Sequence, residues 1–146
     1  MRNVIIIGLV LLGLNLYAKE STESILAKTL YLEAANQSTA GKELVATVIW
    51  NRADGNISKI ASVCLAKKQF SCWNKRKPAN VKIKASKEYA VCQAIAHDVV
   101  TGKFLLVYDI NAYHEKRVHP SWGKAKWFEF QIQDHLFYHI PDGKLS

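Results

Sequence analysis

The pattern of apolar residues changes at Gly102, and this change constrains the fold more than any other feature of the 146-residue sequence. Before Gly102, apolar residues recur at helical spacing. The expected helices span about 22–35, 39–53, 57–66 and 86–101, and residues 67–84 are expected to be an irregular loop. After Gly102, residues 103–110 are rich in β-formers and predict a strand, and residues 126–140 alternate around Gln133-Asp134 as in a β-hairpin. The sequence therefore predicts an α+β protein, with a mainly helical lobe and a small C-terminal β-hairpin lobe.

Residues 1–18 are expected to be a signal peptide rather than part of the fold. Arg2 forms a basic start, an apolar run extends from Val4 to Leu14, and Ala18 offers a small residue at a cleavage point. The apolar run is about half of the ~20 residues that a membrane span needs, so we expect no permanent membrane anchor. The expected location is the periplasm, the cell envelope or the medium. Residues 19–146 contain no repeat, low-complexity tract or linker, which predicts a single domain and a monomer.

The formal net charge of +8 indicates an anionic partner. For an exported protein this partner is peptidoglycan, an anionic lipid or an acidic glycan, unless the charge only maintains solubility. No nucleic-acid partner is expected, because the sequence carries no such motif. The basic residues are read as scattered, apart from a cluster at 74–78.

Three cysteines are present, and an oxidising compartment permits a disulfide. Cys64 and Cys72 enclose a short loop and are the expected pair, whereas Cys92 lies among apolar neighbours and is expected to be a buried free thiol. No cysteine spacing is that of a zinc site.

Glu33 lies on the apolar stripe of the first expected helix, together with Leu26 and Leu30. A carboxyl group on that stripe is either an acid at the end of the helix that points to water or a functional group. Apolar neighbours disfavour the charged form of a carboxyl group, so such an acid can keep a proton for catalysis.

Four segments in order resemble the spore-cortex-lytic and cell-wall hydrolase family. They are LAKTLYLEAANQSTAGKELVATVIWNR from Leu26, KKQFSCWN from Lys67, AYHEKRVHPSW from Ala112 and DHLFYHI from Asp134. The resemblance implies a peptidoglycan-cleaving enzyme with a goose-lysozyme-like catalytic core, most often a lytic transglycosylase. The family's catalytic glutamate, in a Tyr-x-Glu-Ala motif, corresponds to Glu33.

One departure from the family pattern bears on mechanism. Ala35-Asn36-Gln37 stands where the family usually has Arg-Gly-Glu, so a nearby second acid is missing. Glycosidases that use water generally need two carboxylates, whereas a lytic transglycosylase needs one. The expected reaction is therefore cleavage of the muramic acid–glucosamine bond with formation of a 1,6-anhydro end, with Glu33 as general acid and then base. A hydrolytic muramidase and a non-catalytic peptidoglycan-binding protein are the alternatives.

The other motifs predict substrate-binding residues, since aromatic rings beside amide and hydroxyl groups suit a sugar. These residues are Gln69, Ser71, Trp73, Tyr113, His114, Trp122 and His135. Phe70 is expected to be a core residue that holds the loop. The histidines at 114, 119, 135 and 139 have no acidic partner at ligand spacing, so neither a metal nor another cofactor is expected.

Overall fold

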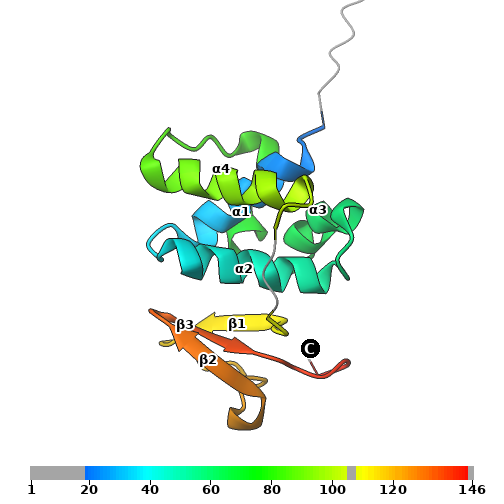
Figure 1. The fold of residues 1–146 in the computed structure, drawn as a ribbon, viewed down its shortest axis with the longest axis vertical. Coiled ribbons are helices and arrows are strands. Elements are labelled where there is room, and N and C mark those ends of the chain that lie inside the picture. Colours follow the sequence, from blue (N-terminus) through cyan, green and yellow to red (C-terminus); the bar gives the residue numbers. More distant parts are fainter. Residues whose placement is uncertain (1–18, 105–107, 145–146) are drawn as a thin grey trace, which may run out of the picture.

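The computed structural model describes residues 19–104 and 108–144, and it has the predicted α+β architecture. The helices are α1 (Thr22–Ala34), α2 (Thr39–Arg52), α3 (Ile57–Leu65) and α4 (Lys87–Val100). The strands are β1 (Ala112–Glu115), β2 (Phe128–Ile132) and β3 (His135–Tyr138). The helices lie together on one side of the small sheet, and α2 is the helix nearest to β1 (Figure 1). The residues expected to form a signal peptide, 1–18, lie outside the described part of the chain.

Side-chain caps explain where the helices begin. Ser21 accepts a hydrogen bond from the backbone N–H of Ser24, and Ser86 accepts one from Tyr89, so each satisfies a donor that the first turn leaves free. Ser38 and Asn56 cap α2 and α3 in the same way. The four predicted helices are confirmed, with small differences at their ends. None of the described helices is long and apolar enough to cross a membrane.

The main core lies between the helices. Leu26 and Leu30 of α1 and Val45 and Val48 of α2 are fully buried, as their spacing predicts. α4 contributes Cys92, Ile95, Ala96 and Val99. The segment between α3 and α4 contains short 3₁₀ turns at Ser71–Trp73 and Pro78–Asn80 and is otherwise irregular, as expected.

The three strands form an antiparallel sheet in the order β1-β3-β2. Gln133, with φ of 51°, makes the tight turn of the predicted β2–β3 hairpin. Phe137 of β3 is fully buried in the helical core and so joins the two lobes. A second, smaller core of Ala112, Tyr138 and Ile140 lies within the β lobe, with Trp122 and Trp127 packed against it.

The strand expected at 103–110 is wrong for the residues that are described. Residues 103–104 and 108–110 are not in a strand, and residues 105–107 lie outside the described part. The strand that precedes the hairpin is β1, at Ala112–Glu115. The backbone N–H groups of Lys103 and Phe104 donate to Asp98 at the end of α4. The Asn51 side chain of α2 donates to the carbonyls of Tyr108 and Ile110. A helix side chain therefore takes the acceptors that a strand partner would use.

The expected Cys64–Cys72 disulfide is also wrong, because all three cysteines are free thiols. The Cys64 thiol lies near the Thr29 side chain, whereas the Cys72 thiol lies near the Glu33 carboxylate, which raises its pKa. These two partners lie one turn apart on α1, so the two thiols contact different levels of the helix. Cys92 is the buried thiol that its apolar neighbours predict.

Candidate active site

A cavity of about 670 Å³ contains Glu33 and is lined by both lobes. Its lining comes from α1, α2, the loop after α3, the sheet and the segment that follows β1. The lining residues are Glu33, Arg52, Lys67, Lys68, Gln69, Phe70, Ser71, Asn74, Tyr113, His114, Glu115, Val118, Trp122 and His135. Six of the seven predicted substrate-binding residues are among them, and Trp73 is not.

The Glu33 carboxylate is half-buried and held by donors from two other segments. Its Oε1 atom accepts a hydrogen bond from the backbone N–H of Cys72 at 3.3 Å, and its Oε2 atom accepts one from the Tyr113 hydroxyl at 3.2 Å. Leu26 and Leu30 are completely buried in the core below it. The acid on the apolar stripe thus occupies the end of that stripe, where the core gives way to the cavity.

Tyr113 is positioned by the β sheet and remains a hydrogen-bond donor over the working pH range. Its ring packs against His135 at a centroid distance of 4.8 Å and against Phe137 at 5.8 Å. Burial of the hydroxyl, together with the neighbouring Glu33 carboxylate, raises the pKa of Tyr113 well above 10. Burial and the same carboxylate raise the pKa of the Cys72 thiol, which therefore stays protonated.

His135 of β3 has an unused polar atom at this site. The residue is 5% exposed, and its Nδ1 atom is buried with no hydrogen-bond partner among the described residues. Burial lowers the pKa of His135 below its usual 6.5, so the imidazole is neutral at pH 7. An orphaned buried nitrogen beside a cavity calls for an explanation such as a ligand or a water.

His114 lines the cavity, but both of its ring nitrogens are engaged within the β lobe. Nδ1 lies 2.8 Å from the Glu115 carbonyl, and Nε2 lies 2.9 Å from the Tyr138 hydroxyl. Because a carbonyl can only accept, Nδ1 donates to Glu115, and Nε2 shares a hydrogen bond with the Tyr138 hydroxyl. Trp122 packs edge-on against the same imidazole. His114 therefore supports the cavity wall and has no free nitrogen for a substrate.

Arg52 is a site residue that the sequence reasoning missed, although it ends a segment of the quoted motif. Its Nε donates to the Asn111 carbonyl at 2.6 Å and its Nη1 to the Gln69 side chain at 3.0 Å. The guanidinium lies 5.7 Å from the centroid of the Phe70 ring. Burial lowers the pKa of Arg52, but a guanidinium remains charged at neutral pH. Arg52 thus connects α2 to both the loop and the β lobe.

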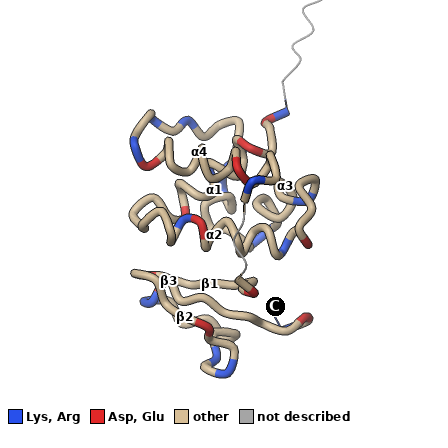
Figure 2. Tube along the Cα trace, viewed as in Figure 1, with Lys and Arg blue, Asp and Glu red and all other residues tan. Residues whose placement is uncertain are grey.

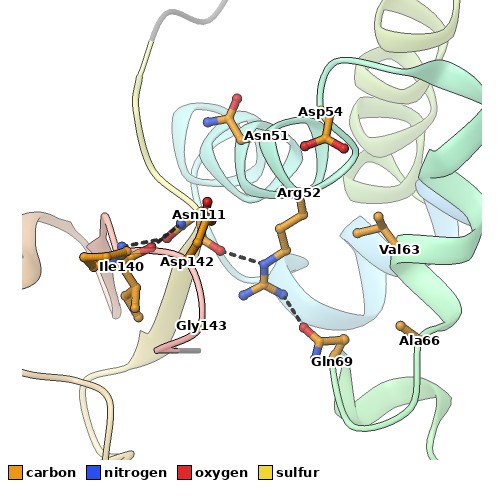
Figure 3. Close-up of a pocket in the computed structure, with 11 residues that line it drawn as sticks. Asn51, Arg52, Asp54, Val63, Ala66, Gln69, Asn111, Ile140, Asp142 and Gly143 are labelled. Carbon is orange, nitrogen blue, oxygen red and sulfur yellow. Dashed lines mark hydrogen bonds between the residues drawn. The ribbon is translucent and has the colours of Figure 1, made fainter. Parts of the chain in front are cut away.

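A second hollow, of about 360 Å³, lies beside the first, and Arg52 and Gln69 line both. Figure 3 shows the Arg52 side chain extending from α2 toward Gln69 and toward the segment of Asn111. Asp54 and Asp142 also line this hollow.

Trp73 serves the core and not the cavity. It is 8% exposed, and its indole N–H donates to the Thr29 hydroxyl at 2.9 Å. Phe70 is a core residue, as expected, and is 2% exposed. It also forms part of the cavity lining. The sequence of a short 3₁₀ turn does not show which of its side chains point into the core. The burial of Trp73 in the turn Ser71–Trp73 was therefore not predictable.

The position of the missing family acid lies away from the cavity. Gln37 is buried, and its Oε1 atom accepts a hydrogen bond from the backbone N–H of Asp134 at 3.4 Å. Its carbonyl accepts from the Lys42 ammonium. Ala35, Asn36 and Gln37 are absent from the cavity lining. The second acid that does line the cavity is Glu115, which the sequence reasoning did not single out.

The part of the chain that is described holds no group of three His, Cys, Asp or Glu side chains that could bind a metal ion. His119 is exposed, and His139 pairs with Asp109 at 3.1 Å on the surface.

Comparison with known proteins gives one family. Searches of curated proteins and of solved structures found no match. The sequence model of the Cell Wall Hydrolase family matches residues 36–138, which is more than two thirds of the chain. The match begins three residues after Glu33 and includes every other lining residue of the cavity. The chain belongs to the cell wall hydrolase family.

Proposed function

We propose that this protein is a lytic transglycosylase that cleaves the muramic acid–glucosamine bond of peptidoglycan, with Glu33 as the catalytic acid and base. Membership of the cell wall hydrolase family supports peptidoglycan as the substrate. The observation that carries the reaction is the half-buried Glu33 carboxyl in the cavity, with a hydrogen-bond donor on each oxygen. The apolar run at residues 4–14 supports export to the envelope, where this polymer occurs.

In the first step the protonated Glu33 donates its proton to the bridging oxygen as the bond from that oxygen to C1 of muramic acid breaks. The glucosamine end leaves as an alcohol, and positive charge develops on the muramic ring. In the second step the Glu33 carboxylate removes the proton of the 6-hydroxyl while O6 bonds to C1. The product is a 1,6-anhydro ring, and Glu33 has recovered its proton.

Tyr113 and the backbone of Cys72 are positioning groups in this scheme. Each donates to one carboxylate oxygen, so together they fix the plane of the carboxyl group. The Tyr113 hydroxyl can also accept a hydrogen bond, so it remains a partner when Glu33 is protonated. His135 lines the cavity, and in this scheme its neutral imidazole faces the sugar.

One observation favours a second candidate, a hydrolytic muramidase. Glu115 lines the same cavity as Glu33 and is exposed to solvent. A second carboxylate is what a water-using glycosidase needs to activate its nucleophile. In that case Glu115 would act as base and the product would have a reducing end.

Digestion of purified sacculi, with mass spectrometry of the released fragments, separates these reactions. The proposal expects anhydro-muramic ends from the parent and from Glu115→Gln, and no release by Glu33→Gln. Reducing ends together with an inactive Glu115→Gln would establish the muramidase instead. Sacculi that stay intact with a folded parent protein, yet bind it, would leave only a non-catalytic binding role.

A further inference from the structure

The positive charge of this protein is concentrated in one segment, in contrast to the scattered distribution read from the sequence. Between Asp54 and Glu88 the sequence has no acidic residue. The basic residues in that interval are Lys59, Lys67, Lys68, Lys75, Arg76, Lys77, Lys82, Lys84 and Lys87. These nine exceed the net charge of +8 of the whole chain, so the remainder is close to neutral. Figure 2 shows the absence of acidic residues along the connection from α3 to α4.

Part of this segment forms a hollow of about 590 Å³. Its lining is Lys75, Arg76, Lys77, Asn80, Val81 and Lys82, and it includes no acid. The four basic residues are exposed, and none of them forms an ion pair among the described residues. The hollow therefore presents unpaired ammonium and guanidinium groups to whatever enters it.

The hollow is fixed to the catalytic helix. The Lys28 ammonium of α1 donates to the Pro78 carbonyl at 2.9 Å while it pairs with Glu20 at 2.6 Å. The Trp73 indole N–H donates a hydrogen bond to the Thr29 hydroxyl, and the backbone N–H of Cys72 donates one to the Glu33 carboxylate. Three hydrogen bonds from two turns of α1 thus hold the segment, which gives it a defined position relative to Glu33.

The basic surface is continuous with the cavity that contains Glu33. Lys67 and Lys68 line that cavity, and so does Asn74. The next residue along the chain, Lys75, begins the basic hollow. The lining of the hollow therefore begins one residue along the chain from the lining of the cavity.

We propose that this basic hollow binds the carboxylates of the stem peptides on the peptidoglycan strand, so that the protein selects glycan that still carries its peptides. This inference rests on the proposed function, because it takes peptidoglycan to be the polymer in the cavity. Stem peptides extend sideways from muramic acid and carry a net negative charge. Their carboxylates would meet the ammonium and guanidinium groups of the hollow while the sugar chain lies over Glu33.

Continuity with the cavity favours the substrate's own peptides over a separate anionic partner. A lipid bilayer is a flat surface, and it would place its charges on the outer lysines without entering the hollow. A phosphate polymer of the wall has the right charge but no reason to lie next to the acid. Both alternatives are distinguished by the choice of ligand in the test.

The test measures binding rather than cleavage, in the Glu33→Gln background, so it stands whether or not the protein is a transglycosylase. Four ligands are compared at low and at high salt. They are sacculi stripped of phosphate polymers, the same sacculi freed of stem peptides by an amidase, chitin, and phosphatidylglycerol vesicles. The proposal expects binding to intact sacculi that is about tenfold tighter than to the amidase-treated material at low salt, and a smaller difference at high salt.

Two triple variants of equal charge locate the effect. Lys75→Gln, Lys77→Gln and Lys82→Gln remove the hollow's lysines. Lys124→Gln, Lys126→Gln and Lys144→Gln remove the lysines of a hollow of about 380 Å³ on the β lobe. The first set should abolish the preference for peptide-bearing sacculi, since three exposed ion pairs account for about a tenfold difference in affinity. The second set should retain it.

Three results would overturn the proposal. Equal binding to intact and amidase-treated sacculi would show that the peptides are not recognised. Equal losses in the two triple variants would show that only the net charge matters. Tighter binding to the vesicles than to stripped sacculi, lost in the first triple variant, would assign the hollow to a membrane surface.

Discussion

The two lobes that line the cavity are built differently. The helical lobe has one large core of mainly aliphatic side chains from all four helices, and Glu33 lies on one of these helices. The β lobe has a small core in which rings and hydrogen bonds dominate, such as the stacked pair of His114 and Tyr138, 5.2 Å apart. The helical lobe therefore owes its shape to burial of apolar area, whereas the β lobe owes much of its shape to specific polar and aromatic contacts.

This difference has a functional consequence. The acid belongs to the lobe with the larger core, where its backbone is held by packing that does not depend on the substrate. Tyr113, which donates to the acid, and His135, which lines the cavity beside it, belong to the β lobe. The contact between the lobes at Phe137 and Arg52 then decides how well the two halves of the site are aligned.

The largest effect is expected from Glu33→Gln, which removes the chemistry and keeps the shape. General acid–base groups are worth about 10²–10⁴-fold in rate, and in the proposed mechanism one residue performs both roles. Turnover of sacculi should fall by at least that factor, with an unchanged melting temperature. Glu23→Gln is the matched control, because Glu23 lies on the same helix, its side chain is 44% exposed, and it pairs with the exposed His97. A folded Glu33→Gln protein that digests sacculi at the parental rate would remove Glu33 from the mechanism.

The next comparison tests the two cores directly. Leu30→Ala in the helical core should lower the free energy of unfolding by about 2–5 kcal/mol, because Leu30 is fully buried. Leu136→Ala in the β lobe should cost about 1 kcal/mol, because Leu136 is only half-buried against the small core. Urea unfolding followed by circular dichroism measures both. If the two costs were equal, the contrast between the cores would not hold.

These cores also explain what could be predicted from sequence. Helical periodicity and caps such as Ser21 and Ser86 predicted all four helices, because helix contacts are local. The strand at Ala112–Glu115 was missed because its pairing with β3 is non-local. In the site, Glu33 could be found from the sequence because it is a charged residue on the apolar stripe of its helix. Arg52 and Glu115 could not, since an exposed-looking charge becomes a cavity residue only through the packing of distant segments.

Tyr113→Phe tests the contact between the lobes at the acid. Loss of one hydrogen bond to a charged group should lower the turnover of sacculi by about 10- to 100-fold. The ring contacts with His135 and Phe137 are preserved, so folding should be unchanged. Tyr108→Phe is the control, because Tyr108 is 49% exposed and does not line the cavity. Parental activity in Tyr113→Phe would mean that the β lobe does not orient Glu33.

The smallest expected effect is the pH dependence that His135 gives to stability. Burial lowers the pKa of His135 in the folded protein, so between that value and the ordinary 6.5 the unfolded chain binds more protons. Stability should therefore fall as the pH drops below 6.5, by at most about 1.4 kcal/mol per pH unit, the limit for one proton. His135→Phe keeps a ring against Tyr113 and cannot titrate, so its unfolding free energy should decline less between pH 7 and 5. His119→Phe, which replaces an exposed histidine, should follow the parent. Parallel plots of unfolding free energy against pH for the parent and His135→Phe would show that this imidazole is not held neutral in the folded protein.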